Sequence, residues 1–381
     1  MKIRVIASTK EGYTMPKEEA ILFSGKSAGI CYLPDTVDTL WAEPEEKTLR
    51  RAKTNVEAGH HSVFGHVTYN LILEEAPKIL AMILNNEQAF NASEKSARYT
   101  IMNCTDLKER KLYEKWTDIF EKRILEVYSY IGKRKARRLA QENARYLISV
   151  FTPATSMEYT VSFQQLNYII YWAKDYIKNM PNNPFSIKVK KVLEDFLKAM
   201  PNLEIEGLTP ENKGRHFSLF ATRKRRTEFG ENYSTCYLAS FAELAQVQRH
   251  RRVSYEMLLP EEKWFYVPFI IQDTEYEDEW YEDIKSLEEN YPQGMLVWVN
   301  ERGTLENFIL KCTDRLCGSV QLETMLQTEE TLKKYMLAAE KKPEILEYLK
   351  PYSKGACCTF PGFVCKSPCV FGPKNALTRK I

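Results

Sequence analysis

The chain contains two stretches built in the same order, and this duplication constrains its fold more than any other feature. An apolar, helix-like run at residues 76–90, APKILAMILNNEQAF, leads into the polar EKSARY at 94–99. A second run, FAELAQV at 241–247, leads into the strongly charged QRHRRVS at 248–254. Because the segments around each run also follow one order, we predict two copies of one unit, residues 1–200 and 201–350, and a separate tail at 351–381.

Length and composition favour a soluble globular protein. The chain has 381 residues, of which 44% are hydrophobic and 28% charged, enough to build two domains. The net charge of +3 is too small to indicate bulk nucleic-acid binding, and the basic clusters at 132–138 and 222–226 are typical of solvated faces. A run of about 18 apolar residues, as a membrane span requires, does not occur, and the charged, strand-like start does not resemble a signal peptide.

Cysteine usage indicates a reducing compartment, so we expect a cytoplasmic protein. Five of the nine cysteines are scattered through patterned segments: Cys31, Cys104, Cys236, Cys312 and Cys317. Four more lie close together in the tail: Cys357, Cys358, Cys365 and Cys369. These four thiols could form a structural zinc knuckle, although their spacing differs from paired C-x2-C motifs. Redox-active or free thiols are the alternative.

Hydrophobic periodicity predicts a mixture of helices and strands. In the first half we expect strands at 4–8 and 64–73, a helix opened by Pro77, a long amphipathic helical stretch at 106–148, and a turn followed by a helix at 154–177. In the second half we expect a strand at 231–241, a helix at 242–258 and a last helix at 329–340. The tail has little periodicity.

Several short motifs carry candidate functional residues. In the first copy they are HHSVFGH, EKSARY and ENARYL, which supply His60, Phe64, His66, Glu94, Ser96, Arg98, Tyr99, Ala144 and Arg145. In the second copy they supply Gln246, Arg249, His250, Arg251, Asn300, Arg302, Arg315, Gln321 and Glu323. Taken in order, these motifs resemble those of the flavin-dependent thymidylate synthases, with Gly65 in place of an acid.

The two copies depart from the family pattern in opposite ways. The first has Asn86, Glu87 and Gln88 at the Arg-His-Arg position, and Ser162 and Gln164 at the Asn-x-Arg position. The second keeps both of these motifs but has no Ser-x-Arg-Tyr. The losses are complementary, so we expect a homodimer that imitates the family's tetramer, with two complete sites and two empty ones. In a complete site, Arg98 and Arg249 would meet around one substrate.

The resemblance implies an α+β fold in which each repeat is a small antiparallel sheet with helices. It also implies a flavin-dependent thymidylate synthase, a methyltransferase that converts dUMP to dTMP with FAD, methylenetetrahydrofolate and NADPH. Two alternatives remain open at this point. One is a flavin enzyme that modifies another pyrimidine nucleotide at C5, and the other is a non-catalytic nucleotide- or RNA-binding relic.

The resemblance also assigns roles to the motif residues. Those implied at the nucleotide are Glu94, Ser96, Ala97, Arg98, Arg145, Gln246 and Arg315. Those implied at the flavin are His60, Arg249, His250, Arg251, Asn300 and Arg302, and the catalytic set is Arg249, His250, Arg251 and Arg315. Arginine suits a phosphate because its fork donates two parallel charge-assisted hydrogen bonds. Ser96 fits a phosphate ligand better than a nucleophile, because no histidine base lies near it in the sequence.

Overall fold

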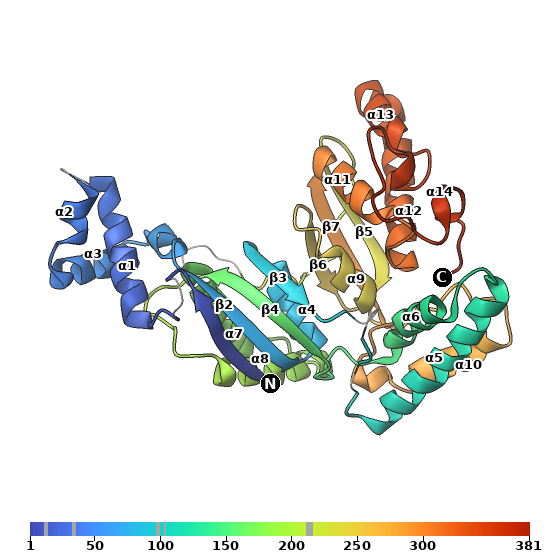
Figure 1. Ribbon diagram of the computed structural model, residues 1–381, viewed down its shortest axis with the longest axis horizontal. Coiled ribbons are helices and arrows are strands. Elements are labelled where there is room, and N and C mark those ends of the chain that lie inside the picture. Colours follow the sequence, from blue (N-terminus) through green and yellow to red (C-terminus); the bar gives the residue numbers. More distant parts are fainter. Residues whose placement is uncertain (11–13, 33–35, 97–99, 103, 211–215) are drawn as a thin grey trace. The chain divides into compact units, whose positions relative to one another are not determined.

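The computed structural model describes residues 1–10, 14–32, 36–96, 100–102, 104–210 and 216–381 (Figure 1). The chain forms two compact units. Unit 1 comprises residues 1–95 and 153–217, and unit 2 comprises residues 96–152 and 218–381. Residues 96–152, which the sequence assigns to the first repeat, are thus part of unit 2, and the repeat boundaries stay a prediction. Within the described ranges no helix is both long and apolar enough to span a bilayer.

Unit 1 is built on a four-stranded antiparallel sheet. Its strands are β1 (Lys2–Ser8), β2 (Thr68–Ala76), β3 (Phe90–Glu94) and β4 (Thr155–Ser162), in the order β1-β2-β4-β3. Its longer helices are α1 (Lys17–Gly29), α3 (Glu45–Glu57), α4 (Lys78–Asn86), α7 (Phe163–Asn179) and α8 (Pro184–Ala199), with a short α2 (Val37–Trp41). Alternate residues of β2 and β4 are buried, as expected for a sheet with one face on a core. The Tyr159 hydroxyl fixes this face to α4 by donating to the Leu84 carbonyl at 3.0 Å.

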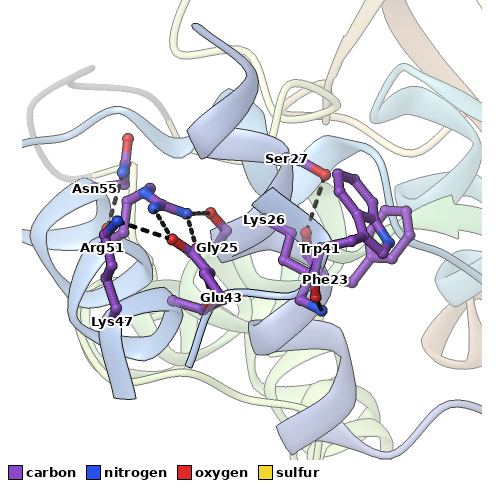
Figure 2. Close-up of polar contacts among 10 residues, drawn as sticks. Phe23, Gly25, Lys26, Ser27, Trp41, Glu43, Lys47, Arg51 and Asn55 are labelled. Carbon is purple, nitrogen blue, oxygen red and sulfur yellow. Dashed lines mark hydrogen bonds and ion pairs between the residues drawn. The ribbon is translucent and has the colours of Figure 1, made fainter. Parts of the chain in front are cut away.

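Helices α1 and α3 of unit 1 approach each other closely at a glycine. A side chain on Gly25 would place its Cβ 2.5 Å from the Thr48 carbonyl oxygen. Arg51 of α3 stabilises this contact by donating to the Gly25 carbonyl of α1 at 2.9 Å and to the Glu43 carboxylate at 2.6 Å and 2.8 Å (Figure 2). The glycine and the arginine therefore fix the helix pair together.

Unit 2 is built on a three-stranded antiparallel sheet. Its strands are β5 (Asn232–Ser240), β6 (Ser254–Leu258) and β7 (Leu296–Thr304), in the order β5-β7-β6. Its helices are α5 (Leu107–Val127), α6 (Lys133–Ala144), α9 (Phe241–Val247), α10 (Tyr276–Lys285), α11 (Leu305–Arg315), α12 (Leu322–Ala338), α13 (Pro343–Leu349) and α14 (Gly372–Asn375). Helices α5 and α10 meet through Trp116 and Trp280, whose rings lie edge to face 4.9 Å apart. The Trp116 indole also donates to Asp283 at 2.8 Å.

The two sheets share one connectivity. In each, a strand leads through a helix into an edge strand, and a later strand inserts between the two and continues into another helix: β2-α4-β3 with β4-α7, and β5-α9-β6 with β7-α11. The caps also match, since Ser162 begins α7 and Thr304 begins α11 by accepting a backbone N–H. The predicted α+β class with antiparallel sheets is confirmed.

Four sequence-based assignments were wrong in detail. Residues 155–162 form β4 and not a turn, because the alternating side chains Thr155, Met157, Tyr159 and Val161 face a core. The helix expected at 242–258 ends at Val247, and its second half forms β6. The stretch at 106–148 breaks at residues 128–132, and the strand expected at 64–73 begins only at Thr68 after a 3-10 turn at His61–Gly65.

Candidate functional site

A buried polar cluster at the start of α12 connects distant parts of unit 2. The Glu323 carboxylate accepts hydrogen bonds from the Ser240 amide at 2.8 Å, the Ser240 hydroxyl at 2.6 Å and the Tyr146 hydroxyl at 2.8 Å. Gln321 donates to the Tyr146 hydroxyl and accepts a hydrogen bond from the Arg145 guanidinium. The cluster borders a cavity of about 240 Å³. We call these five residues the Glu323 cluster.

Burial raises the pKa of two acidic groups in the Glu323 cluster, the Glu323 carboxyl and the Tyr146 hydroxyl. Loss of solvation raises the pKa of Glu323. It also raises the pKa of Tyr146 well above its ordinary value, and the neighbouring Glu323 adds to this effect. Tyr146 therefore stays a hydrogen-bond donor. The Arg145 guanidinium keeps its Nε buried and without a hydrogen-bond partner in the described part of the chain.

Arg315 lies at the last turn of α11 and binds the end of another helix. Its Nη2 donates to the Gln246 carbonyl at 3.3 Å, a favourable place for a cation because the C-terminus of a helix carries partial negative charge. The Gln246 side chain accepts from the Thr324 hydroxyl at 2.9 Å. Burial lowers the pKa of Arg315, and the nearby cation Arg249 lowers it further. Among the residues described, nothing accepts from the Nε of Arg315.

The Arg249-His250-Arg251 turn follows α9 and is fixed by its histidine. His250 is only 5% exposed. Its Nδ1 lies 2.8 Å from a carboxylate oxygen of Asp314, and its Nε2 lies 3.3 Å from the Asn307 carbonyl oxygen. This hydrogen bond lowers the pKa of Asp314. Arg249 is exposed and Arg251 partly buried. The imidazole of His250 therefore points into the protein, whereas the guanidinium of Arg249 points to solvent.

Asn300 and Arg302 lie on β7, and the side chain of Asn300 forms hydrogen bonds with the backbone of a neighbouring segment. Its amide nitrogen donates to the Arg223 carbonyl at 3.0 Å, and its oxygen accepts from the Arg225 amide at 3.1 Å. Arg302 forms an ion pair with Glu256 at 3.4 Å. Asn300 thus ties the basic segment 222–226 to the sheet, and its predicted role at a cofactor stays a prediction.

Three buried ionisable residues of unit 2, Lys311, Glu301 and Glu243, were missed by sequence reasoning. Lys311 pairs with Glu301 at 2.6 Å, and neither side chain is exposed. Glu243 is fully buried, its two carboxylate oxygens have no hydrogen-bond partner within the described ranges, and burial raises its pKa well above the ordinary value. The Ser-x-x-Glu pattern that begins at Ser240 could have indicated an acid at this helix start, but it does not reveal the burial.

The predicted residues of unit 1 are His60 and Glu94. His60 is exposed, and its neighbour His61 lines a cavity of about 750 Å³ together with Phe64. The Glu94 carboxylate accepts from Lys78 at 2.6 Å and is almost fully buried. Glu94 is the last residue of β3, so the EKSARY motif begins at the end of this strand.

The predicted nucleotide loop is described only at its edges. The Ser96 carbonyl accepts from the Thr100 hydroxyl at 2.8 Å. Ala97 and Arg98 lie outside the described residues. Convergence of Arg98 and Arg249 therefore stays a prediction.

The predicted zinc knuckle is not supported. All nine cysteines are free, and the described ranges hold no group of three or more His, Cys, Asp or Glu side chains placed to bind a metal ion. The four tail cysteines also lie at different depths, since Cys357 is buried and Cys365 exposed. A tetrahedral site would require their sulfurs to converge on one point.

Comparison with known proteins gives one match in sequence. Residues 13–171 match the family model described as "Thymidylate synthase complementing protein". No curated protein sequence matches the chain. The matched segment contains the motifs of the first copy, from His60 to Arg145.

Solved structures give weaker likenesses. The flavin-dependent thymidylate synthase ThyX from Helicobacter pylori, complexed with FAD and dUMP, is 13% identical, with 53% of this chain and 94% of that chain covered and a TM-score of 0.31. The UMP/dUMP methylase PolB from Streptomyces cacaoi, bound with 5-Br dUMP, is 14% identical, with 55% and 91% covered and a TM-score of 0.33. The sequence match to the thymidylate synthase complementing protein family is thus confined to residues 13–171, less than half of the chain.

Proposed function

We propose that the protein is a flavin-dependent enzyme that methylates dUMP to dTMP, with methylenetetrahydrofolate as the one-carbon donor and NADPH as the reductant. One observation carries the proposal. Arg145, which lies in the family-matched segment, is bound by Gln321, which lies far outside it. This contact supports our proposal that residues from both halves of the chain contribute to one cationic site in unit 2.

Arg145 and Arg315 are the groups we assign to the nucleotide. Each keeps a buried Nε–H without a partner in the part of the chain that the structure describes. A buried donor left unpaired costs about 1–3 kcal/mol, so an acceptor from a ligand would stabilise both side chains. Phosphate oxygens or uracil carbonyls supply such acceptors, and cations beside uracil oxygens favour reaction at C5.

The residues present fit a flavin dinucleotide in part. The exposed Arg249, next to Arg315, offers positive charge for a pyrophosphate. His60, Arg251 and Arg302 are the further candidates to hold the cofactor. His250 and Asn300 already form hydrogen bonds with other protein groups. We therefore propose that His250 positions the Arg249 turn and that Asn300 positions the segment 222–226.

The flavin, when bound, supplies hydride chemistry, and the chain supplies binding and electrostatics. Arg145 and Arg315 hold and polarise the nucleotide. Ser96, with the loop that follows it, would bind the phosphate. The Glu323 cluster keeps Arg145 in place, because Gln321 accepts from its guanidinium and Tyr146 orients Gln321. No cysteine nucleophile is required in this proposal.

We also propose that the chain is a tandem of two diverged copies. The shared connectivity of the β2-β4-β3 and β5-β7-β6 sheets supports it. A homodimer would then contain two complete sites, each with the loop at Ser96 from one copy and the Arg249 turn from the other. Flavin stoichiometry tests this arrangement: two FAD per dimer are expected, and four would overturn it.

The activity test is anaerobic turnover with dUMP, methylenetetrahydrofolate and NADPH, followed by the mass of the nucleotide. We expect a yellow protein and a product that has gained one CH2 unit. A different one-carbon gain would replace the proposal with the second candidate below. A colourless protein without NADPH oxidation would indicate a non-catalytic nucleotide- or RNA-binding protein.

The second candidate is a flavin enzyme that modifies another pyrimidine nucleotide at C5. Gly65 favours it, since this position carries an acid in the family pattern. A Cβ on Gly65 would lie 3.4 Å from the Gln164 side-chain oxygen, so Gln164 already borders the space an acid would use. Offering UMP and dCMP beside dUMP in the same assay separates the two candidates by the ratio of kcat/KM.

A further inference from the structure

A cavity in unit 1 lies apart from the groups that we assign to the nucleotide and the flavin. It has a volume of about 750 Å³, and small-molecule sites typically measure about 300–1,000 Å³. Its walls come from α1, from α3, from the turn that follows α3 and from the segment 205–209. On this turn Gly59, His61 and Phe64 line the cavity, whereas His60 is not one of the described residues that line it.

One wall of the cavity is a single face of α3. Leu49, Ala52, Lys53 and Val56 line it, and residues three and four positions apart lie on the same side of a helix. Ala52 is buried, whereas Leu49 is 43% exposed, so this face runs from the interior of the unit to solvent. The contact of Arg51 with the Gly25 carbonyl holds the helix against α1. This wall is therefore fixed without a ligand.

The segment 205–209 forms another wall and is also fixed. The buried side chain of Asn167 in α7 donates to the Leu203 carbonyl at 3.2 Å and accepts from the Ile205 amide at 2.7 Å. At Gly207, where φ is +80°, the segment approaches α3 so closely that a Cβ would lie 3.1 Å from Cγ1 of Val56. A glycine thus allows this wall to meet α3, and the cavity is formed before a ligand binds.

The buried end of the cavity has an apolar surface. Phe64 is fully buried and His61 is 8% exposed. The Nδ1 of His61 lies 2.9 Å from the Tyr168 hydroxyl, and its Nε2 lies 3.1 Å from the Val56 carbonyl oxygen. Because both ring nitrogens already have protein partners, the imidazole offers a ligand only its carbon surface. The apolar part of a ligand fits this end.

The exposed end of the cavity carries more negative than positive charge. Glu57, Glu206 and Lys53 line it, so carboxylates outnumber ammonium groups among the described lining residues. Lys53 lies 3.8 Å from Glu57, and these two charges largely offset each other. The exposed carboxylate of Glu206 provides the excess negative charge. A cationic group on a ligand is therefore favoured here, and an anionic group is disfavoured.

We propose that this cavity binds small organic amines. The apolar body of the amine lies between α3 and the segment 205–209, against His61 and Phe64, and its ammonium group lies beside Glu206. An organic acid of the same shape would place a carboxylate beside Glu206 and binds more weakly for that reason. The inference rests on the shape and charge of the cavity and does not depend on the proposed nucleotide chemistry.

The first test is an NMR titration of the full-length chain, labelled at its isoleucine, leucine and valine methyl groups, with phenethylamine. We expect saturable shifts of the methyl signals of Ile21, Leu49, Val56 and Ile205, which line the cavity. The acid 3-phenylpropionate carries the same ring and should bind about tenfold more weakly, because its charge is reversed. Shifts confined to other methyl groups, or equal affinity for the acid, would overturn the proposal.

Two variants at exposed positions test the polar and apolar contacts separately. Glu206→Gln should weaken phenethylamine binding about twofold to fivefold, as expected for an exposed ion pair, and added salt should reduce the difference. The matched control is Glu204→Gln on the same segment, since Glu204 pairs with Lys174 at 2.6 Å and should leave the affinity unchanged. Leu49→Ser should weaken both phenethylamine and the acid. An unaltered affinity in Glu206→Gln would refute the placement of the ammonium group.

Competition with FAD separates this cavity from the proposed flavin site and needs no variant. Saturating FAD should leave the affinity for phenethylamine unchanged, because His60 does not line the cavity. Displacement of the amine by FAD would show that the cavity belongs to the flavin site and would overturn the inference. A chain that binds no flavin should give the same amine titration, so failure of the proposed function is distinguishable from failure of this proposal.

Discussion

The Tyr146 hydroxyl donates to the Glu323 carboxylate at 2.8 Å, and the two residues are 177 positions apart. Tyr146 belongs to the segment that matches the thymidylate synthase complementing protein family, and Glu323 lies beyond it. Through Gln321, the same contact fixes Arg145. Residues from the second half of the chain therefore hold Tyr146 and Arg145 of the matched segment in place.

Replacing Tyr146 by phenylalanine should weaken this junction. The change removes one acceptor of the Gln321 amide and one donor to the Glu323 carboxylate, and it leaves the amide with a longer hydrogen bond to Glu323 at 3.3 Å. We therefore expect a loss of about 1–3 kcal/mol in the free energy of unfolding. We also expect a higher KM for the nucleotide, since Arg145 loses its support. Urea unfolding and steady-state kinetics measure the two effects. Tyr130→Phe is the control, because Tyr130 is 60% exposed, and an equal effect of both changes would refute the role of Tyr146.

The buried carboxyl of Glu243 should make the stability of the protein depend on pH. Burial raises its pKa well above 4.5, so its contribution to stability is complete below pH 4.5 and is lost as the pH rises towards the folded-state value. Glu243→Gln removes the titrating group while keeping its size. We expect the variant to be more stable than the parent at pH 8 and equally stable near pH 4, measured by urea unfolding at both values. If the variant is less stable than the parent at pH 8, the ionised Glu243 carboxylate is stabilised by its surroundings and the prediction is wrong.

Arg315 tests the assignment to the nucleotide. Arg315→Lys keeps the charge but loses the forked geometry that suits a phosphate or a uracil carbonyl. With one or two charge-assisted hydrogen bonds lost, we expect KM for dUMP to rise about tenfold to a hundredfold. Arg226→Lys, at an exposed position, should leave KM unchanged. An unaltered KM in Arg315→Lys would remove this residue from the binding site.

The fold class and several elements follow from the sequence because they depend on local rules. Pro77 predicts the start of α4, and the prolines at 181 and 184 predict the break between α7 and α8, since proline cannot continue a helix. The charged turn at 248–252 was assigned to a helix, although Val253, Tyr255 and Met257 alternate as in a strand. Tyr255 and Met257 lie in β6, which pairs with β7, and a pairing between segments so far apart in the chain leaves no signal in the local sequence.

Sequence motifs named several residues of the candidate site, whose roles stay predictions, but sequence reasoning missed the buried ionisable residues near them. Arg315, Gln246 and Gln321 were singled out, and the structure brings each against a partner in unit 2. Glu243 and Lys311 were not, because a charged residue on an amphipathic helix is normally assigned to solvent. Only tertiary contacts show which charges are enclosed.

The buried pair of Lys311 and Glu301 predicts non-additive substitutions. Lys311→Met alone leaves the Glu301 charge enclosed, so we expect a loss of about 3–5 kcal/mol in the free energy of unfolding. Adding Glu301→Gln removes that charge and should restore much of the stability. The hydroxyls of Tyr233 and Tyr237 donate to the two different oxygens of Glu301, at 2.7 Å and 2.6 Å. In the glutamine, one hydroxyl keeps an oxygen as its acceptor and the other can accept from the amide N–H. Additive losses in a double-mutant cycle would contradict this account.

In unit 1, the pair of Arg51 and Glu43 predicts sensitivity to acid (Figure 2). The hydrogen bond from Arg51 lowers the pKa of Glu43 to about 2. The stabilising contribution is therefore fully present above the ordinary carboxyl value of 4.5 and is lost as the pH falls through that range towards 2. Arg51 also binds the Gly25 carbonyl, so the loss should loosen the contact between α1 and α3.

Arg51→Lys tests this relationship with a neighbouring control. Lysine keeps the charge but cannot bind both carboxylate oxygens and the Gly25 carbonyl in the same geometry. We expect faster hydrogen exchange of the α1 and α3 amides at neutral pH and a smaller difference between pH 7 and pH 3 than in the parent. Arg50→Lys alters the adjacent, exposed pair with Glu46, which contributes little, and should exchange like the parent. If both variants behave alike, the forked contact does not hold the helices together.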